Sequence, residues 1–147
     1  MKKTLKIKLL DNDVAVPKYM TTGSAAMDVC ACLKESVLLN PGDRALIPTG
    51  IIIEQPIDTV VLVCARSGLA SKHGITLSNG VGVIDSDYTG EIKVALVNLS
   101  NEPFLVEDKM RVAQLMVLSP IRAELQTTDE IQKTERGDGG FGSTGEK

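Results

Sequence analysis

Aromatic side chains are scarce in this sequence. Its 147 residues include two Tyr, two Phe and no Trp, which is 3% of the chain. This scarcity argues against a protein that binds single-stranded nucleic acid by stacking bases on aromatic rings. Hydrophobic residues nevertheless make up 43% of the chain, so we expect a folded protein with an aliphatic core.

The chain also lacks an excess of positive charge and any long hydrophobic run. It has 16 Lys and Arg against 19 Asp and Glu, and so does not show the basic footprint of a DNA- or RNA-binding protein. Its apolar runs, such as residues 60–65, are far shorter than the roughly 20 residues that span a bilayer. Lysines at positions 2, 3, 6 and 8 interrupt any signal-peptide core. We therefore expect a cytoplasmic protein with no nucleic-acid or membrane partner.

Cysteine and histidine are too few for a strong metal-site prediction. The three cysteines are an odd number, which favours reduced thiols. Cys30, Cys32, Cys64 and the only histidine, His73, would make a zinc site on paper, but the usual pair of closely spaced ligands is missing. Positions 30 and 32 share one face of a predicted strand, so buried thiols are the favoured interpretation.

Alternation of apolar and polar residues dominates the chain and predicts an all-β protein. Residues 4–10 place apolar side chains on one face and lysines on the other, and residues 91–98 are covered in part on both faces. Further strands are predicted at residues 28–33, 37–39, 44–47, 51–54, 59–65 and 111–118, with turn signals between them. This spacing indicates a sandwich or barrel. One short helix is predicted, capped by Ser67 and ending at Gly74.

The composition changes once, after Pro120. We expect a single domain over residues 1–147, with a core at about 1–120 and a mobile arm at about 121–147. The arm ends in a glycine-rich run that is either a flexible terminus or a set of backbone N–H groups for an anion. Arg136 adds a cation suited to phosphate, and Phe141, an aromatic residue amid glycines, favours packing on a flat ligand.

Arg66, Ser67 and Gly68 stand at the start of the predicted helix. Unpaired N–H groups at a helix start, beside an Arg and a Ser, form an anion site. An ordinary N-cap with a surface Arg explains the same residues equally well.

Two other polar features stand out against apolar strands. Asp85 and Asp87 follow one such strand, as a turn pair, a metal site or a general base. Asp87 is explained by turn chemistry, whereas Asp85 ends an apolar run and is the better candidate for a base. Gln114 interrupts a predicted buried strand and needs hydrogen-bond partners, either as a satisfied core amide or as part of a site.

Five segments, in order, resemble those of the trimeric dUTPase family and together cover nearly the whole chain. They are residues 25–31, 66–70 with 74–75, 79–98, 111–115 and 136–145. The most specific are the third, which contains Gly82-Val-Ile-Asp-Ser-Asp-Tyr88, and the fifth, Arg136-Gly-Asp-Gly-Gly-Phe-Gly-Ser-Thr-Gly145.

The resemblance implies a jelly-roll-like β-domain that assembles as a homotrimer. Each active site would draw the first, second and fourth segments from one subunit, the third from another and the arm from the last. The implied reaction is Mg²⁺-dependent hydrolysis of dUTP to dUMP and pyrophosphate, which keeps uracil out of DNA and supplies dUMP for thymidylate synthesis.

The resemblance also implies a role for each candidate residue. Asp85 would orient and deprotonate the attacking water, and Asp28 would hold Mg²⁺ through its water shell. The phosphates would contact Arg66, Ser67, Gly68, Gln114 and, from another subunit, Arg136. Uracil and deoxyribose would contact Asn79, Gly82, Val83, Ile84, Tyr88 and Lys93, and the closing arm would add Phe141, Gly142 and Ser143. A tight hairpin would exclude a 5-methyl group, and Tyr88 would exclude a 2′-hydroxyl.

Several positions depart from the family pattern. They are Ala26, Thr89, Lys109 with Met110, and Cys64 with Ala65, and none of them removes a proposed catalytic group. Two alternatives remain at this point. A dCTP deaminase-like or bifunctional enzyme would need a further carboxylate beside the base and usually a longer chain. A trimeric binding module would be favoured by loss of Asp85 or Arg136, and both are present.

Overall fold

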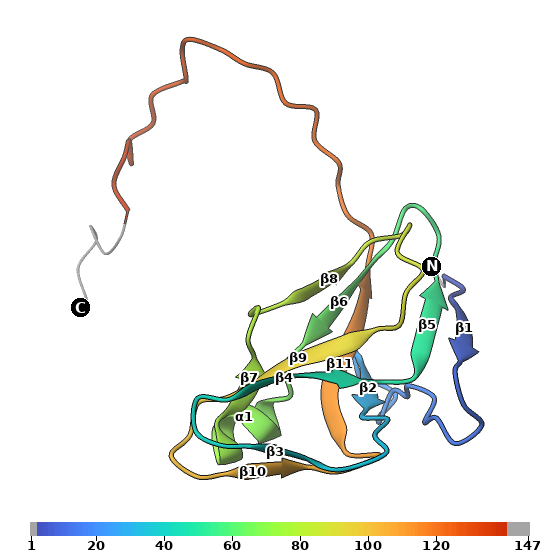
Figure 1. Ribbon diagram of the computed structural model, residues 1–147. Helices are drawn as coiled ribbons and strands as arrows, with labels where there is room; N and C mark the ends of the chain where they lie inside the picture. The colour runs from blue at the N-terminus through green and yellow to red at the C-terminus, as the bar shows by residue number, and fades with distance from the viewer. Residues whose placement is uncertain (1–2, 141–147) are drawn as a thin grey trace.

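The computed structural model describes residues 3–140, and most of its regular structure is β-strand (Figure 1). One sheet has the strand order β2 (Met27–Cys30), β11 (Arg111–Leu118), β6 (Val60–Cys64) and β8 (Gly82–Ile84). A second has the order β4 (Arg44–Pro48), β9 (Lys93–Asn98) and β7 (Ile75–Leu77). Two further pairs are β1 (Lys6–Leu9) with β5 (Ile51–Glu54) and β3 (Val37–Leu39) with β10 (Phe104–Val106). All of these pairings are antiparallel.

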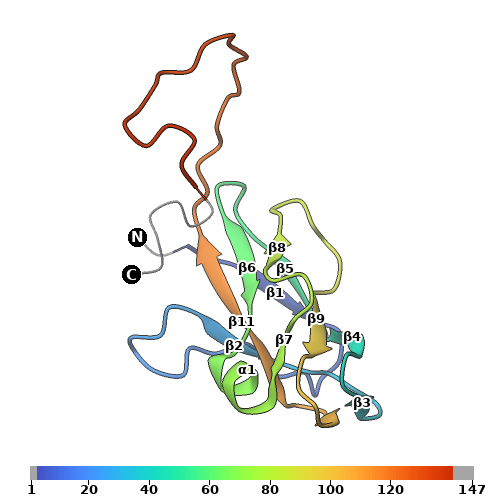
Figure 2. The same cartoon turned by 90° about the vertical axis from the view of Figure 1, so that its left-hand side faces the viewer.

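One aliphatic core joins the two larger sheets. Figure 2 shows β2, β11 and β6 in one layer and β4 and β9 in another. Side chains alternate along β9, and those that point inward are Val94 and Leu96, together with Ile92 just before the strand. Each of the three is at most 1% exposed. Their partners in the core include Val61 and Leu115 from the opposite sheet. The prediction of an all-β domain with an aliphatic core is confirmed.

The described part of the chain contains one helix, α1 (Ser67–His73). Its end is confirmed, because Gly74 adopts φ 66° in the left-handed region that favours glycine. Its predicted cap is wrong. Arg66 occupies the N-cap position and no side chain caps the helix. The helix begins one residue earlier than a Ser67 cap requires, with the Arg66 carbonyl accepting bonds from the N–H groups of Leu69 and Ala70.

Three strand predictions match the structure residue for residue, and two strands were missed. The strands at residues 37–39, 51–54 and 111–118 are confirmed with the predicted bounds. The three-residue strands β7 and β10 were not predicted. The strand predicted over 28–33 is too long. After Cys30 the backbone changes partner, since Ala31 donates to Met110 and Cys32 to Pro48.

The prediction that Cys30 and Cys32 are buried thiols on one face of a strand is wrong. Cys30, Cys32 and Cys64 are all free and half-buried, and Cys32 lies outside β2. Burial still raises the pKa of the Cys30 thiol, even though the Arg111 cation acts in the opposite direction. No group of three or more His, Cys, Asp or Glu suited to a metal ion occurs among residues 3–140.

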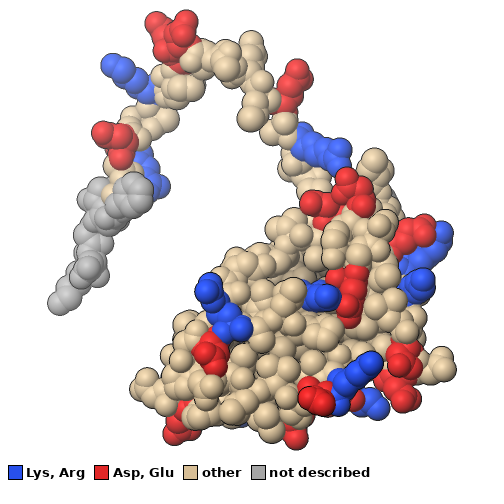
Figure 3. Space-filling model, viewed as in Figure 1, with Lys and Arg blue, Asp and Glu red and all other residues tan. Residues whose placement is uncertain are grey.

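After β11 the chain leaves the domain as an extended arm. Residues 119–140 contain no helix or strand, and Figure 1 shows them curving away from the sheets. Ile121 and Leu125 are 96% and 93% exposed, so the described part of the chain leaves them uncovered. On the face seen in Figure 3 acidic and basic side chains are interspersed over the domain and the arm. Among the described residues, no helix has the length and apolar character needed to cross a membrane.

Candidate active site

A cluster of one acid, two arginines and an amide lies on one face of the four-stranded sheet. The Asp28 side chain is only 5% exposed. Its Oδ1 accepts a hydrogen bond from Gln114 Nε2 at 2.9 Å, and its Oδ2 accepts one from Arg111 at 3.0 Å. The Arg66 guanidinium is 3.4 Å from the same Oδ2 and donates to the Arg111 carbonyl at 3.1 Å. We call Asp28, Arg66, Arg111 and Gln114 the cationic corner, because two guanidinium groups share one carboxylate.

A β-bulge brings this corner together. Arg111 pairs with Cys30 and Gln114 with Asp28, so two residues of β11 lie opposite one residue of β2. In a regular strand, side chains three residues apart point to opposite faces. The extra residue restores Arg111 to the face of Gln114 and Asp28, as bulges commonly re-aim a side chain next to a functional site.

The start of α1 borders the cationic corner through Arg66. The first N–H groups of a helix, here those of Ser67 and Gly68, have no partner within the helix. Ser67 and Gly68 are exposed, and a Cβ at Gly68 would meet no atom within 4 Å. Packing inside this chain therefore does not require glycine at position 68, and the backbone there is open to a ligand.

Asp85 follows β8 directly and is held by its backbone. Its carbonyl oxygen accepts hydrogen bonds from Tyr88 N at 3.1 Å and from Gln55 Nε2 at 2.9 Å. The residue itself is exposed. Asp85 also borders a hollow of about 550 Å³ that Asp87 and Val83 line as well. The candidate base is thus fixed in its main chain while its side chain faces outward.

Tyr88 is fixed across the turn that follows. Its hydroxyl donates to the Glu91 carbonyl at 2.9 Å, and its ring passes over Gly90. A Cβ at Gly90 would lie 2.5 Å from the Tyr88 hydroxyl oxygen, so only glycine leaves room for this ring position. Tyr88 remains 45% exposed, which leaves part of the ring available to a ligand.

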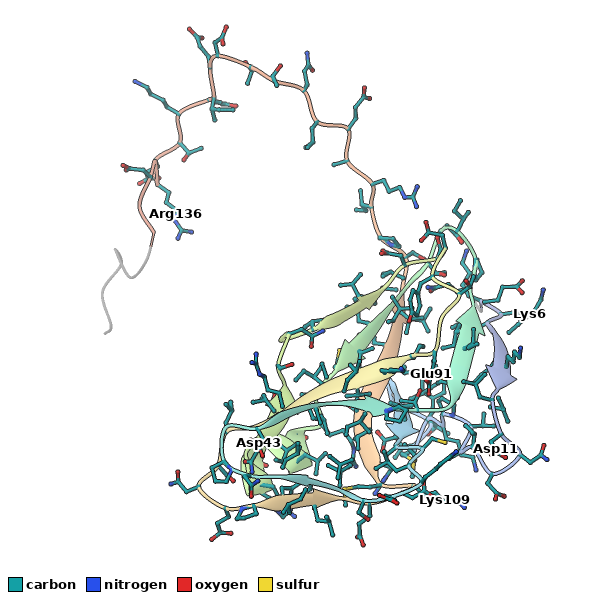
Figure 4. All side chains as sticks on the ribbon, in the orientation of Figure 1. Lys6, Asp11, Asp43, Glu91, Lys109 and Arg136 are labelled. Atoms are coloured by element: carbon teal, nitrogen blue, oxygen red, sulfur yellow. The ribbon has the colours of Figure 1, made fainter. Side chains whose placement is uncertain are left out.

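The remaining hairpin residues gather around the same turn. Val83 is 59% exposed, and Asn79 lies beside Gly82. Ile84, Tyr88 and Lys93 line a hollow of about 380 Å³. Glu91 (Figure 4) lines the same hollow. One of its carboxylate oxygens accepts a hydrogen bond from Gly50 N at 2.9 Å, and the other is 3.7 Å from Lys93 Nζ.

One chain does not bring all the candidates together. In the ladder of β6 with β8, Val63 pairs with Gly82 and Val61 with Ile84, so Asp85 lies beyond the Val61 end. Cys64, at the opposite end of β6 and two residues before Arg66, is about 13 Å from the Asp85 end along the strand, at ~3.3 Å per residue. Arg136 lies on the arm, away from the sheets of the domain (Figure 4). Phe141, Gly142 and Ser143 lie outside the described residues.

Sequence reasoning assigned no role to two residues that contact the candidates. Arg111 belonged to the fourth segment without a role of its own. It precedes Gln114 by three residues, and in a strand this spacing puts two side chains on one face only if a bulge lies between them. Gln55 continues the inward positions of Ile51 and Ile53, which are 0% and 5% exposed, and is itself 8% exposed. A polar residue in a core-facing slot was the signal available there.

Asp28 offers limited room for a metal ion. A carboxylate has about four lone-pair positions. Gln114 occupies one on Oδ1, and the two arginines occupy Oδ2. The free position on Oδ1 fits one water of a hydrated Mg²⁺, whereas it does not make a direct ligand set.

Comparison with known proteins agrees with this geometry. A sequence model of the dUTPase family matches residues 12–145. The chain is 48% identical over 145 residues to the deoxyuridine 5′-triphosphate nucleotidohydrolase of Neisseria gonorrhoeae, with 96% of each chain covered. A mutant dUTPase of Staphylococcus bacteriophage 80alpha, solved with dUpNHpp, has a similar structure with TM-score 0.86 and 26% identity, over 97% of this chain and 98% of the phage chain.

A second phage structure shares the fold. It is a mutant dUTPase from phage phi11 of S. aureus, described as revealing the coordination of a structural Mg(II) ion, with TM-score 0.77 and 23% identity over 86% of this chain and 97% of that one. The predicted resemblance and enzyme class are confirmed, and the chain belongs to the dUTPase family.

Proposed function

We propose that this enzyme hydrolyses dUTP at the α-phosphorus, with a water molecule that Asp85 activates. The water oxygen bonds to the α-phosphorus, the bond from that phosphorus to the α,β-bridging oxygen breaks, and Asp85 accepts the water proton. The products are dUMP and pyrophosphate. One observation carries this assignment. Asp85 has a backbone carbonyl held by two hydrogen bonds and an exposed side chain, so its carboxylate starts from a fixed point and is open to a water molecule.

The cationic corner would bind the triphosphate. Two arginines against one carboxylate leave one uncompensated positive charge, and a guanidinium has five N–H donors in a fork that matches phosphate oxygens. Gln114 uses one of its two amide hydrogens on Asp28, so the other is free for the α-phosphate region. The open backbone at Ser67 and Gly68 would add further donors. Most of phosphoryl-transfer catalysis lies in such positioning and charge stabilisation.

Mg²⁺ fits this site as an ion held mainly by the substrate. It would neutralise charge on the triphosphate, and Asp28 would contact its water shell through the free position on Oδ1. The structural Mg(II) ion described for the phage phi11 protein supports the use of this metal.

The hairpin between β8 and β9 would select the base and the sugar. Its backbone from Gly82 to Asp85, with Asn79 beside it and Lys93 returning, would pair with the polar edge of uracil. The ring of Tyr88 would lie against deoxyribose, where its fixed position over Gly90 leaves no space for a 2′-hydroxyl. The dUTP analogue bound to the phage 80alpha dUTPase supports a uracil nucleotide as ligand.

A homotrimer would complete each site. Asp85 and Arg66 lie at opposite ends of one ladder, so the base of one copy would serve the cationic corner of another. The arm of a third copy would bring Arg136 to the terminal phosphates. In the present chain Arg136 Nε donates to the Gly139 carbonyl at 2.7 Å, which leaves its terminal N–H groups for a ligand. The contacts of Phe141, Gly142 and Ser143 with uracil remain predictions.

This reaction would keep uracil out of DNA and supply dUMP for thymidylate synthesis.

A pyrophosphate-release assay with Mg²⁺ tests this proposal across dUTP, dCTP, dTTP and UTP. We expect dUTP to be hydrolysed far faster than the other three. Equal rates on all four nucleotides would contradict the proposed hairpin selectivity. Ammonia release from dCTP would instead indicate the deaminase activity considered above.

A further inference from the structure

A buried amide lies directly behind the candidate base. Gln55 follows β5 and is 8% exposed, in line with the inward side chains of that strand. Its Nε2 donates to the Ile84 carbonyl at 2.8 Å and to the Asp85 carbonyl at 2.9 Å. Both amide hydrogens are therefore spent on two consecutive carbonyls at the point where β8 ends.

The loop after Gln55 holds its backbone in place. A residue before proline is restricted to extended backbone, and Pro56 follows Gln55. The chain then turns, with Thr59 N donating to the Pro56 carbonyl at 3.0 Å and the buried Thr59 hydroxyl donating to the same carbonyl at 2.6 Å. The orientation of the amide itself follows from the two carbonyls of β8 and Asp85, because the amide oxygen in place of Nε2 would face two acceptors.

The Asp85 backbone needs such an anchor because its strand has ended. Ile84 is the last residue of β8 in register with β6, opposite Val61. Beyond it the Asp85 carbonyl is held by Tyr88 N within its own turn and by Gln55 from a different loop. Among the described residues, Gln55 is the one hydrogen-bond partner of the Asp85 carbonyl that comes from outside this turn.

We propose that Gln55 is a positioning residue, which sets the backbone of Asp85 and through it the place of the carboxylate relative to the α-phosphorus. This inference rests on the proposed role of Asp85 as the base. A reacting group displaced by about 1 Å loses on the order of 10²-fold in rate, so even a slight shift of this turn has a large effect.

The test compares Gln55→Met with a matched change elsewhere. Asn98 is a second buried amide, 0% exposed, whose Nδ2 donates to the carbonyls of Leu39 and Glu102. Asn98 ends β9, outside the β6–β8 ladder that leads to Asp85, and Asn98→Leu removes two such donor bonds together with the two bonds that Ser100 donates to Asn98 Oδ1. We expect Gln55→Met to lower kcat by about 10- to 100-fold with KM for dUTP within about threefold of the parent, because the phosphate contacts are untouched. Asn98→Leu should keep kcat within about twofold wherever it is folded.

Hydrogen exchange at the Tyr88 amide gives a readout independent of turnover. This N–H bonds to the Asp85 carbonyl, so its protection should fall in Gln55→Met and stay unchanged in Asn98→Leu. If Gln55→Met does not fold, Gln55→Glu is used instead, because it keeps the length and shape of the side chain and replaces the amide NH₂ donor with a carboxylate oxygen. The same kcat and hydrogen-exchange measurements then apply. Equal losses of kcat in the Gln55 and Asn98 variants, or unchanged protection at Tyr88, would overturn the proposal.

The variant Asp85→Asn distinguishes a failure of the Gln55 proposal from a failure of the proposed role of Asp85 as the base. Full activity in Asp85→Asn shows that Asp85 is not the base, and the role of Gln55 falls with it. If Asp85→Asn is inactive and Gln55→Met is fully active, the positioning role of Gln55 is rejected and the role of Asp85 as the base stands.

Discussion

The two candidate acids are held in opposite ways. Asp28 is buried, and its side chain accepts bonds from Arg111 and Gln114 with Arg66 nearby. Asp85 is exposed, and the bonds that fix it end on its backbone carbonyl. Because both oxygens of Asp28 already accept hydrogen bonds, we infer that Asp28 belongs to the scaffold of the site and that Asp85 is the better candidate for the base.

The strongest test of this difference is Asp85→Asn. We expect turnover to fall by about 10³-fold, because a positioned general base contributes on the order of 10²- to 10⁴-fold. The free energy of unfolding and the affinity for a non-hydrolysable dUTP analogue should be nearly unchanged, since the side chain is exposed. Steady-state kinetics, chemical denaturation and titration calorimetry measure the three quantities. A variant that binds and turns over normally would remove Asp85 as the base.

Truncation after Ile131 tests whether Asp85 and the cationic corner suffice without the arm. Residues 121–140, the part of the arm that the structure describes, contribute no strand, so we expect a folded protein of unchanged oligomeric state. Its kcat/KM should fall by about 10²-fold or more, as for other cations supplied in trans to a phosphoryl group.

Two point variants refine the truncation. Arg136→Ala should reproduce most of the loss, whereas Lys133→Ala, which removes another exposed cation of the arm, should not. Sedimentation analysis checks the assembly. Dissociation into monomers on truncation would show that the arm is mainly structural.

Asp28→Asn should affect stability as well as rate. The change leaves Arg66 and Arg111 without their shared anion, and we expect the free energy of unfolding to fall by about 2 kcal/mol. Lys6→Met is the control, because Lys6 (Figure 4) forms an ion pair with Glu54 whose two side chains are exposed, and its loss should not be measurable. Denaturation at one fixed protein concentration compares the variants. If both unfold alike, Asp28 is not a structural acid.

The difference between the two acids also explains what the sequence could predict. Asp85 was found from its place at the end of an apolar run, and Gln114 from its place inside one, because both signals are local. The partners of Asp28 depend on a bulge in β11, and the anchor of Asp85 comes from a residue 30 positions away. Neither follows from a periodic pattern, since register and side-chain contacts are set by pairing between distant strands.

The smallest expected effect concerns the turn that leads into β11. Lys109 (Figure 4) adopts φ 61°, a left-handed conformation that costs a residue with a Cβ about 1 kcal/mol. Lys109→Gly should therefore raise the free energy of unfolding by about 0.5 kcal/mol, after the greater freedom of glycine in the unfolded chain is subtracted. Lys109→Ala, which keeps the Cβ, should give no gain. The N–H of residue 109 still bonds to the Ala31 carbonyl in both variants, so the cationic corner and kcat should be unchanged. Equal stabilisation by alanine would show that the lysine side chain, and not the backbone, is the source of the cost.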